Sequence, residues 1–189
     1  VQTSQRMAYK SVDYFLVTGA AQIEPMLEKK VLPKRAEIIE LMEGSNNFVP
    51  KKSSNTDQKL KLIWVARFIA RKDFGTMLKA CQLLKKKQVD FSLDIISSGG
   101  PLFNACLQML KDLDLENETT LVCNLSQDKM QAKYQAADFF VSTSWLEGSG
   151  WALCEAMACG TAAVVTDIPP HRWMTDVGRA GGLFSCGNA

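Results

Sequence analysis

The sequence contains almost no histidine and little net charge. His171 is the only histidine among 189 residues, and the formal net charge is +2. The six cysteines are scattered along the chain and form no C-x-x-C pair. A zinc site is not expected without clustered cysteine and histidine. A nucleic-acid partner is not expected either, because no strongly basic surface is available for the phosphates.

Long apolar runs are missing as well. No stretch of about eighteen apolar residues occurs, so no membrane-spanning helix is expected. The apolar fraction of 47% and the charged fraction of 22% are typical of a globular domain. The cysteines lie mostly inside apolar segments, so we expect reduced thiols that act as small core residues in a cytoplasmic protein. The chain begins at Val1 without a signal pattern and stops soon after a glycine, and we expect a fragment of a longer protein.

A polar stretch interrupts the pattern of apolar segments. Residues 43–58 are rich in Gly, Pro, Ser and Asn and have no periodicity, which predicts a linker and a domain boundary. Before it, the pattern predicts a strand over 12–17, a helix over 20–31 and a strand over 37–42.

After this stretch, predicted strands and helices alternate. The strands are expected at 60–66, 91–96, 119–123, 138–142, 162–166 and 182–184, with helices at 73–87, 102–113 and 127–136 and another within 144–160. Strands that are continuous apolar runs, each followed by a helix, indicate a parallel sheet covered on both faces. The fold class is therefore α/β, a doubly wound parallel sheet of the Rossmann-like kind. Ligands of such sheets bind at the carboxyl ends of the strands.

The residues from 144 to 160 combine a glycine turn with an almost wholly apolar segment. The turn at 148–150 follows Glu147, and Glu155 is the one carboxylate inside the segment. Because the segment is apolar on all sides, it predicts a buried helix. The free N–H groups at the start of such a helix favour an anion. Glu155, about one turn inside, would either accept hydrogen bonds from vicinal sugar hydroxyls or pair with an arginine or lysine elsewhere.

Two cations follow the first strand of the alternating part. Arg67 comes directly after the apolar run, and Lys72 follows five residues later. A guanidinium and an ammonium at one strand end suit a diphosphate, since arginine gives a bidentate fork and lysine a mobile point charge. The alternative is a surface cation pair. Arg71 is expected to face solvent.

Two other strand-end loops are candidates for ligand contact. Gly99 and Gly100 lie in the turn at 97–101, where the missing side chains allow backbone to approach a ligand closely; a plain turn is the alternative. The backbone of residues 124–126 could meet a planar base.

The last loop and the tryptophans are expected to be structural. Residues 166–173 contain two prolines, which predict a rigid loop, and His171 within it is expected to be structural. Trp145 and Trp151 could stack on a sugar, but core packing is favoured. Asp73 is expected to cap the helix that follows it.

These residues resemble the retaining glycosyltransferases with the GT-B fold, in glycosyltransferase family four, also called the glycosyl transferases group 1. Residues 144–160 match the block Ser-x-x-Glu-Gly-x-Gly-x-x-x-x-Glu-Ala-Met-Ala-x-Gly, in which Glu147 and Glu155 form its E-x7-E motif. Four further similarities occur in register, at Arg67-x4-Lys72, Gly100-Pro101, Ala137-Asp138 and, in the C-terminal loops, Asp167-Ile168-Pro169-x-His171-Arg172 with Ala180-Gly181-Gly182-Leu183-Phe184.

The likeness extends from about residue 60 to residue 188 and implies a division of the chain. Residues 1–50 resemble the tail of an N-terminal acceptor domain with the start of the linker. Residues 51–189 resemble the nucleotide-sugar-binding domain, cut short at its C-terminus. The implied partner is a UDP-, GDP- or ADP-linked sugar. The acceptor domain is otherwise missing from the sequence, so the fragment alone is expected to be inactive, and any peripheral membrane contact would be made through that domain.

The resemblance also implies a role for each matching residue. Arg67 and Lys72 would hold the donor diphosphate and stabilise the charge of the leaving group. Glu147 would orient the transferred sugar, and Glu155 would bind the ribose hydroxyls. No metal ion or other cofactor is implied, and the transfer would retain anomeric configuration. The complete set of implied donor-binding residues is Gly99, Gly100, Leu125, Ser149, Gly150, Trp151 and Glu155.

Three positions depart from the family pattern, and three other functions are compatible with parts of the sequence pattern or are disfavoured by it. Ser98, Cys123 and Trp173 differ from the family pattern and leave the donor base and sugar open. The alternatives are a non-catalytic nucleotide-sugar-binding module and a GT-B epimerase. An NAD-dependent enzyme is disfavoured, because no G-x-G-x-x-G follows the first strand of the alternating part.

Overall fold

The structure divides the chain close to the start of the polar stretch. The computed structural model describes residues 7, 9, 11–17, 26–28, 37–40, 47–52 and 59–189, and the chain forms two compact units, 1–44 and 45–189. In the first unit, strands β1 (Tyr14–Val17) and β2 (Glu37–Glu40) lie inside the ranges predicted for them, and the structure pairs them in parallel. Of the helix expected over 20–31, residues 26–28 are helical and the others lie outside the described residues.

The second unit is built on one parallel sheet. Its strands lie in the order β5-β4-β3-β6-β7-β8, and every neighbouring pair is parallel. Each strand falls inside its predicted range, so the predicted doubly wound α/β fold is confirmed. The strands are β3 (Leu60–Val65), β4 (Phe91–Ile96), β5 (Thr119–Val122), β6 (Phe139–Ser142), β7 (Ala162–Thr166) and β8 (Gly182–Phe184).

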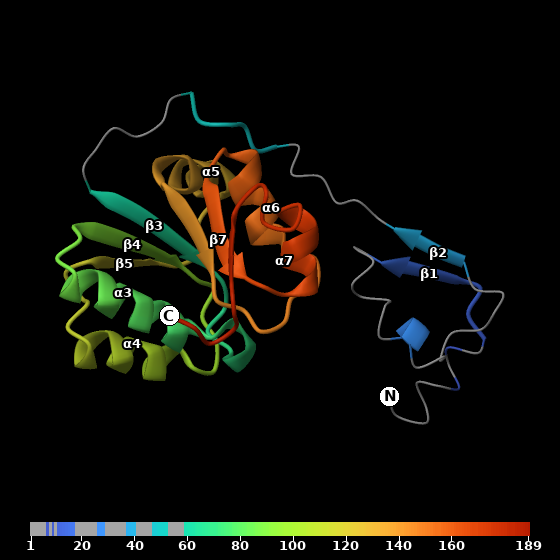
Figure 1. Cartoon of the computed structure of the whole chain (residues 1–189), viewed down its shortest axis with the longest axis horizontal. Coiled ribbons are helices and arrows are strands. Elements are labelled where there is room, and N and C mark those ends of the chain that lie inside the picture. The colour runs from blue at the N-terminus through green and yellow to red at the C-terminus, as the bar shows by residue number, and fades with distance from the viewer. Residues whose placement is uncertain are drawn as a thin grey trace. The chain divides into compact units, whose positions relative to one another are not determined.

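Helices cover both faces of this sheet. The helices α3 and α4 lie on one face, and α5, α6 and α7 lie on the other (Figure 1). This is the arrangement that right-handed crossovers produce when the chain first moves one way along the sheet and then returns in the other direction. The helices are η1 (Ala70–Lys72, 3-10), α3 (Phe74–Lys86), α4 (Phe103–Asp112), α5 (Gln127–Ala136), α6 (Trp151–Ala158) and α7 (Pro169–Met174).

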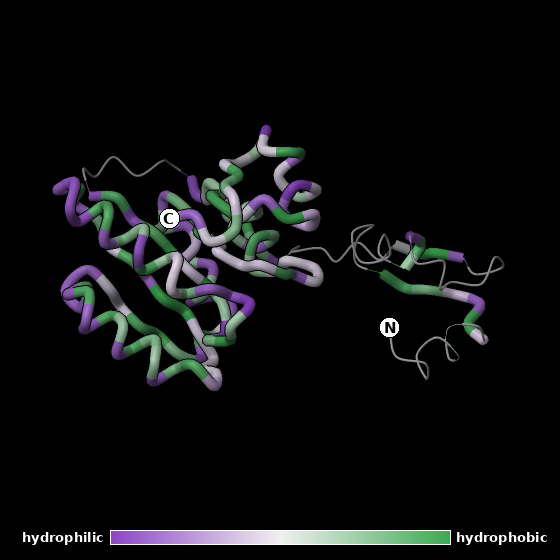
Figure 2. The backbone as a smooth tube through the Cα atoms, turned by 60° about the horizontal axis from the view of Figure 1, so that its bottom comes forward, coloured by the Kyte–Doolittle hydropathy of each residue, from purple (hydrophilic) through white to green (hydrophobic). Residues whose placement is uncertain are grey.

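Two hydrophobic clusters sit on the two faces, because successive side chains of a strand point in opposite directions. On β3, Leu62 and Trp64 belong to the cluster under α3 and α4, whereas Ile63 belongs to the cluster under α5 and α6. Figure 2 shows mainly apolar residues along the strands, and apolar residues alternating with hydrophilic ones along the helices. The strands are thus buried on both sides and the helices on one.

The strand order creates a crevice at the centre of the sheet. From β3 the chain moves outward to β4 and β5, and from β6 it moves the opposite way to β7 and β8. The loops that leave β3 and β6, although these strands are neighbours, therefore diverge at their carboxyl ends. This is the place where a doubly wound sheet binds its ligand.

The prediction of a rigid loop over 166–173 is wrong in part. Pro169 and Pro170 occupy the first two positions of helix α7, and Ile168 before them is extended. Proline is compatible with a first helical turn because the N–H groups there have no partner within the helix. The two prolines therefore begin a helix here instead of stiffening a loop.

The prediction that the tryptophans pack in the core is also wrong. Trp145 is 55% exposed and Trp151 is 46% exposed. The Trp145 indole N–H donates to Asp73 Oδ2 at 2.8 Å, which holds the ring at the surface. Helix α6 itself is less buried than its composition suggests: within it, Leu153 and Ala156 are the buried residues.

Three further features of this unit are the cap of α3, the state of the cysteines and the length of the helices. Asp73 caps α3 as expected and accepts a hydrogen bond from the Thr76 N–H. All six cysteines are free, and Cys81, Cys106 and Cys159 are buried among apolar side chains. Within the described residues, no helix is long and apolar enough to cross a membrane.

Candidate donor-binding site

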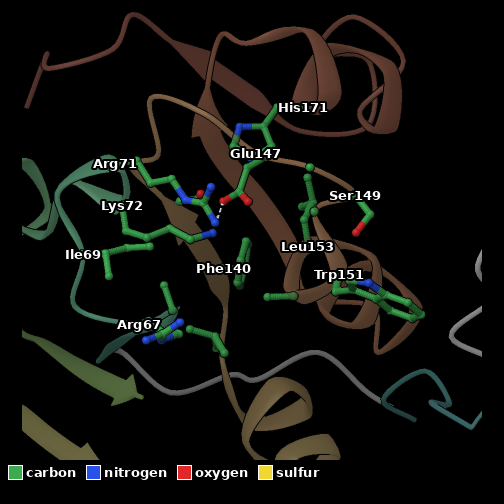
Figure 3. A pocket seen from close by; sticks show the side chains of 16 residues that line it. Arg67, Ile69, Arg71, Lys72, Phe140, Glu147, Ser149, Trp151, Leu153 and His171 are labelled. Carbon is green, nitrogen blue, oxygen red and sulfur yellow. Dashed lines mark hydrogen bonds and ion pairs between the residues drawn. The ribbon is translucent and has the colours of Figure 1, made fainter. Parts of the chain in front are cut away.

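A cavity of about 400 Å³ lies at the carboxyl ends of β3 and β6. Its walls come from the loop after β3, the loop after β6, the start of α6 and one side chain of α7. Figure 3 shows Lys72 and Glu147 meeting at one end of it, with Arg67 farther along. The polar side chains that line it are those of Arg67, Arg71, Lys72, Ser142, Glu147, Ser149 and His171.

Lys72 and Glu147 form an ion pair at the cavity wall. The Lys72 Nζ lies 2.5 Å from Glu147 Oε1, and the two side chains are 16% and 12% exposed. The Ser144 hydroxyl donates to the same carboxylate oxygen at 2.7 Å. The Thr143 hydroxyl donates to the Lys72 carbonyl at 2.9 Å, which fixes η1 against the loop after β6. Both charged groups are therefore held in place by the ends of two neighbouring strands.

Arg67 differs from Lys72 in having no counterion among the residues that the structure describes. It lies just beyond the end of β3, after Ala66, is exposed, and forms no ion pair with a described residue. An unpaired guanidinium beside a cavity suits an anionic ligand, because it loses no existing salt bridge when the ligand binds. Arg71, which was expected to face solvent, is exposed but also lines the cavity.

The glycine turn places backbone N–H groups at the cavity. Gly150 precedes α6 with φ 65°, and no side chain caps the helix. The N–H groups of the first turn point out of the helix, where they favour negative charge. Ser149, Gly150 and Trp151 all line the cavity, so the structure brings these three predicted residues together with Arg67 and Lys72.

Glu155 does not line the cavity and forms a hydrogen bond with a tyrosine. Its Oε2 accepts a hydrogen bond from the Tyr134 hydroxyl at 2.9 Å. Burial raises the pKa of the Glu155 carboxyl, and the Tyr134 hydrogen bond opposes this. The partner is a tyrosine of α5 rather than the arginine or lysine considered from the sequence, and Glu155 is not among the residues that line the cavity.

A second cavity of about 360 Å³ adjoins the first. The two share Val65, Ala66 and Arg67, so Arg67 lies where they meet. Leu125 lines the second cavity together with residues at the ends of β4 and β5. The predicted base-side residue thus lies on the other side of Arg67 from Lys72 and Glu147.

Gly99 and Gly100 line neither of these cavities. A Cβ on Gly100 would come within 2.4 Å of the Phe68 carbonyl oxygen, so the close approach here is to the protein's own backbone. Gly99 has φ 89° with open space around it, and its carbonyl accepts from the Phe68 N–H at 3.0 Å. Both glycines thus support the loop that carries Arg67.

His171 is buried against the end of β7 and reaches the first cavity. Its Nδ1 lies 2.9 Å from the Thr166 carbonyl oxygen and 3.2 Å from the Thr166 hydroxyl. Burial lowers the pKa of the ring from its ordinary value of 6.5, so the imidazole is neutral near pH 7. Local sequence pattern does not indicate that His171 lies beside Glu147, since His171 belongs to α7 and Glu147 to the loop after β6.

Comparisons with known proteins agree with this geometry. The family described as "Glycosyl transferases group 1" matches residues 45–189. The chain belongs to this family. Within the glycosyl transferases group 1, it is 26% identical over 176 residues to mannosylfructose-phosphate synthase from Agrobacterium fabrum, covering 84% of this chain and 38% of that protein. It is 23% identical over 148 residues to alpha-monoglucosyldiacylglycerol synthase from Streptococcus pneumoniae, covering 76% and 33%.

Solved glycosyltransferase structures share the fold. Sucrose-phosphate synthase from Thermosynechococcus elongatus superposes with a TM-score of 0.82 at 19% identity, over 96% of this chain and 47% of that one. The pneumococcal O-GlcNAc transferase GtfA, solved with UDP and GlcNAc, gives a TM-score of 0.78 at 19% identity, over 97% and 36%. The six-stranded unit therefore has the Rossmann-like fold of the GT-B glycosyltransferases. The chain spans about a third to a half of the length of these relatives.

Proposed function

We propose that residues 45–189 form the donor-binding part of a retaining glycosyltransferase, which transfers a hexosyl group from a nucleotide-diphosphate sugar to a saccharide or lipid-linked acceptor. One observation carries the proposal: the unpaired Arg67 and the paired Lys72 line one cavity, together with the start of α6. Three sources of positive potential converge there, and a diphosphate is the part of the donor that needs them.

The two adjoining cavities divide the donor between them. The nucleoside would lie beside Leu125, the diphosphate at Arg67, and the sugar toward Lys72 and Glu147. Arg67 and Lys72 would stabilise the charge that develops on the leaving diphosphate. Glu155 reaches the donor only through a carboxylate oxygen that Tyr134 leaves available, and its proposed role is to bind the ribose hydroxyls.

We assign no metal ion to this reaction, because Arg67 and Lys72 supply the positive charge that a metal would otherwise provide. EDTA should accordingly leave the affinity for a nucleoside diphosphate unchanged.

Two further proposals concern the whole protein. We place residues 1–44 in the acceptor domain and residues 45–50 at the start of the connection to the donor-binding part, since the relatives are two to three times longer than this chain. The 189-residue chain would then bind the donor but transfer its sugar poorly or not at all. The free cysteines favour a cytoplasmic location.

Calorimetric titration of the 189-residue chain with UDP, GDP, ADP and their sugar conjugates tests the proposal. Arg67→Ala should weaken binding by about 1–3 kcal/mol, the range for a hydrogen bond to a charged group. Glu155→Ala should weaken binding of the nucleotides through the ribose. Arg179→Ala is the matched control, because Arg179 is exposed and pairs with Asp176 outside the cavity. If no nucleotide diphosphate binds, or if both site variants bind like the control, the proposal is wrong.

A further inference from the structure

His171 is a buried titratable group in the donor cavity that the proposed roles leave unused. Its side chain is almost fully buried, yet it lines the same cavity as Lys72 and Glu147. Figure 3 shows its ring next to the Glu147 side chain. A buried polar ring that reaches a ligand cavity has one nitrogen available for the ligand if the other nitrogen is satisfied by the protein.

The contacts at Nδ1 decide which nitrogen is available. The Thr166 carbonyl at 2.9 Å can only accept, so Nδ1 must carry the hydrogen. The Thr166 hydroxyl donates to the Ser144 carbonyl at 2.6 Å, which leaves its oxygen as a second acceptor for the same N–H. In the neutral ring, Nε2 is then a hydrogen-bond acceptor. No described residue forms a hydrogen bond with it.

Glu147 presents a second acceptor of the same kind. Its Oε1 receives both the Lys72 ammonium and the Ser144 hydroxyl. Its Oε2 forms no hydrogen bond with a described residue. One end of the cavity therefore offers an unprotonated nitrogen from α7 and a carboxylate oxygen from the loop after β6, and a matching ligand must bring two donors.

We propose that His171 Nε2 and Glu147 Oε2 accept hydrogen bonds from two neighbouring hydroxyls of the transferred sugar, so that this end of the cavity selects a neutral sugar with a free vicinal diol. The inference rests on the proposed function, because a diphosphate at Arg67 and Lys72 is what places the sugar there. A uronic acid is disfavoured, since its carboxylate would face two acceptors. His171 is thus a specificity-determining residue.

Two substitutions separate this role from a structural one. His171→Asn keeps a donor near the Nδ1 position for the Thr166 carbonyl but removes the atom at Nε2. His171→Gln loses the first contact but places an amide oxygen near Nε2. A purely structural role predicts that the Asn variant behaves like the wild type and that the Gln variant is the impaired one. A sugar contact predicts the reverse for donor binding.

The readout is the affinity for a sugar nucleotide relative to its own nucleoside diphosphate. It is measured by calorimetry on the 189-residue chain with UDP, UDP-glucose, UDP-galactose, UDP-glucuronic acid, GDP and GDP-mannose. For the best-bound sugar nucleotide, His171→Asn should worsen this ratio roughly threefold to tenfold, the effect of one hydrogen bond. His171→Gln should recover part of the loss, and neither variant should change the affinity for UDP or GDP.

Each outcome bears on the inference. An unchanged ratio in His171→Asn, with thermal unfolding confirming a folded variant, overturns it while leaving the proposed function intact. If the variant fails to fold, the wild type still decides, because tighter binding of UDP-glucuronic acid than of UDP-glucose contradicts the acceptor pair. If no nucleoside diphosphate binds the wild type, the proposed function fails and the inference fails with it.

Discussion

At the scale of single residues, the Lys72–Glu147 ion pair lines the donor cavity and is also expected to contribute to the stability of the fold. Removing water from two charges is costly, and the attraction between them offsets that cost only while both are present. Each side chain is largely covered, and the Ser144 hydroxyl adds a further bond to the carboxylate. Loss of either partner therefore leaves a poorly solvated charge at the cavity wall.

A double-mutant cycle should reveal this coupling. Glu147→Leu and Lys72→Met are each expected to lower the free energy of unfolding by about 1–3 kcal/mol, because each leaves the other charge unpaired. The double variant should be less destabilised than the sum of the two single variants, as measured by urea unfolding. Additive effects within about 0.5 kcal/mol would show that the pair is not coupled.

The buried imidazole makes stability depend on pH. Burial, with a smaller contribution from Lys72, lowers the folded-state pKa of His171, while the Thr166 hydrogen bond and Glu147 oppose this. Below its ordinary pKa of 6.5, the unfolded chain binds a proton that the folded chain resists. Stability should therefore fall as pH drops from about 6.5 toward the lowered folded-state pKa, by at most about 1.4 kcal/mol per pH unit.

Urea unfolding between pH 7.5 and 5 measures this slope. Other groups titrate in the acid range, because the pKa of Glu155 is raised and that of Asp167 is lowered by its hydrogen bond to Arg172. The comparison with His171→Asn isolates the histidine, since the variant keeps both carboxylates. Parallel pH profiles for the two proteins would mean that the imidazole does not resist protonation when folded.

At the scale of elements, the turn between β4 and α4 fixes the loop that carries Arg67. Gly100 has φ 148°, and a Cβ there would lie 2.4 Å from the Phe68 oxygen. The Leu102 N–H donates to that same oxygen at 3.1 Å. Any shift that relieves the clash would disturb this bond and move the backbone next to Arg67.

Gly100→Ala should therefore weaken both stability and nucleotide binding. The expected loss in the free energy of unfolding is about 2 kcal/mol or more, from overpacking against backbone. Gly99→Ala is the matched control, because its φ of 89° strains the backbone while no atom lies within 4 Å of the new Cβ. Calorimetry and urea unfolding on both variants should show the larger effect at Gly100; equal effects would assign the loss to φ alone.

The elements that the sequence predicts well are those specified by local pattern. The strands of the six-stranded sheet are apolar runs, and each lies inside its predicted range. Helix α7 was not predicted, because proline disfavours a helix everywhere except in its first turn, and this segment begins with two prolines. The exposure of Trp145 was not predicted, because the hydrogen bond from its indole N–H to Asp73 joins two segments more than seventy residues apart.

The candidate site was predictable where motif residues follow strands, and not where distant side chains meet. Arg67 and Lys72 could be predicted because both are charged residues of the segment that follows β3. Tyr134 could not be predicted as the partner of Glu155, since the contact joins two different helices, α5 and α6. The neighbours of His171 could not be predicted either, because the position of its ring depends on the end of β7 and on α7, a helix that the sequence pattern did not predict.

At the scale of the whole molecule, every residue assigned to the donor lies in the second unit, together with both hydrophobic clusters. Residues 48–51 of the polar stretch before β3 are part of that unit. The Lys51 N–H donates to the Cys159 carbonyl at 2.9 Å, and the Val49 N–H donates to the Gln131 side chain at 3.1 Å. The Phe48 ring packs edge-on against Tyr134. Residues 48–51 thus join the ends of α5 and α6.

Two truncations should separate this contribution from that of the first unit. A chain of residues 45–189 should unfold in one cooperative transition and bind nucleoside diphosphates like the 189-residue chain, because it keeps the clusters and the cavity. A chain of residues 53–189 should be less stable by about 1–3 kcal/mol, since it leaves partners of these backbone bonds unsatisfied. Urea unfolding and calorimetry on the two chains give the comparison. If the chain of residues 45–189 does not unfold cooperatively or does not bind nucleotides, the donor-binding unit requires residues 1–44. The proposal that residues 45–189 bind the donor on their own is then wrong.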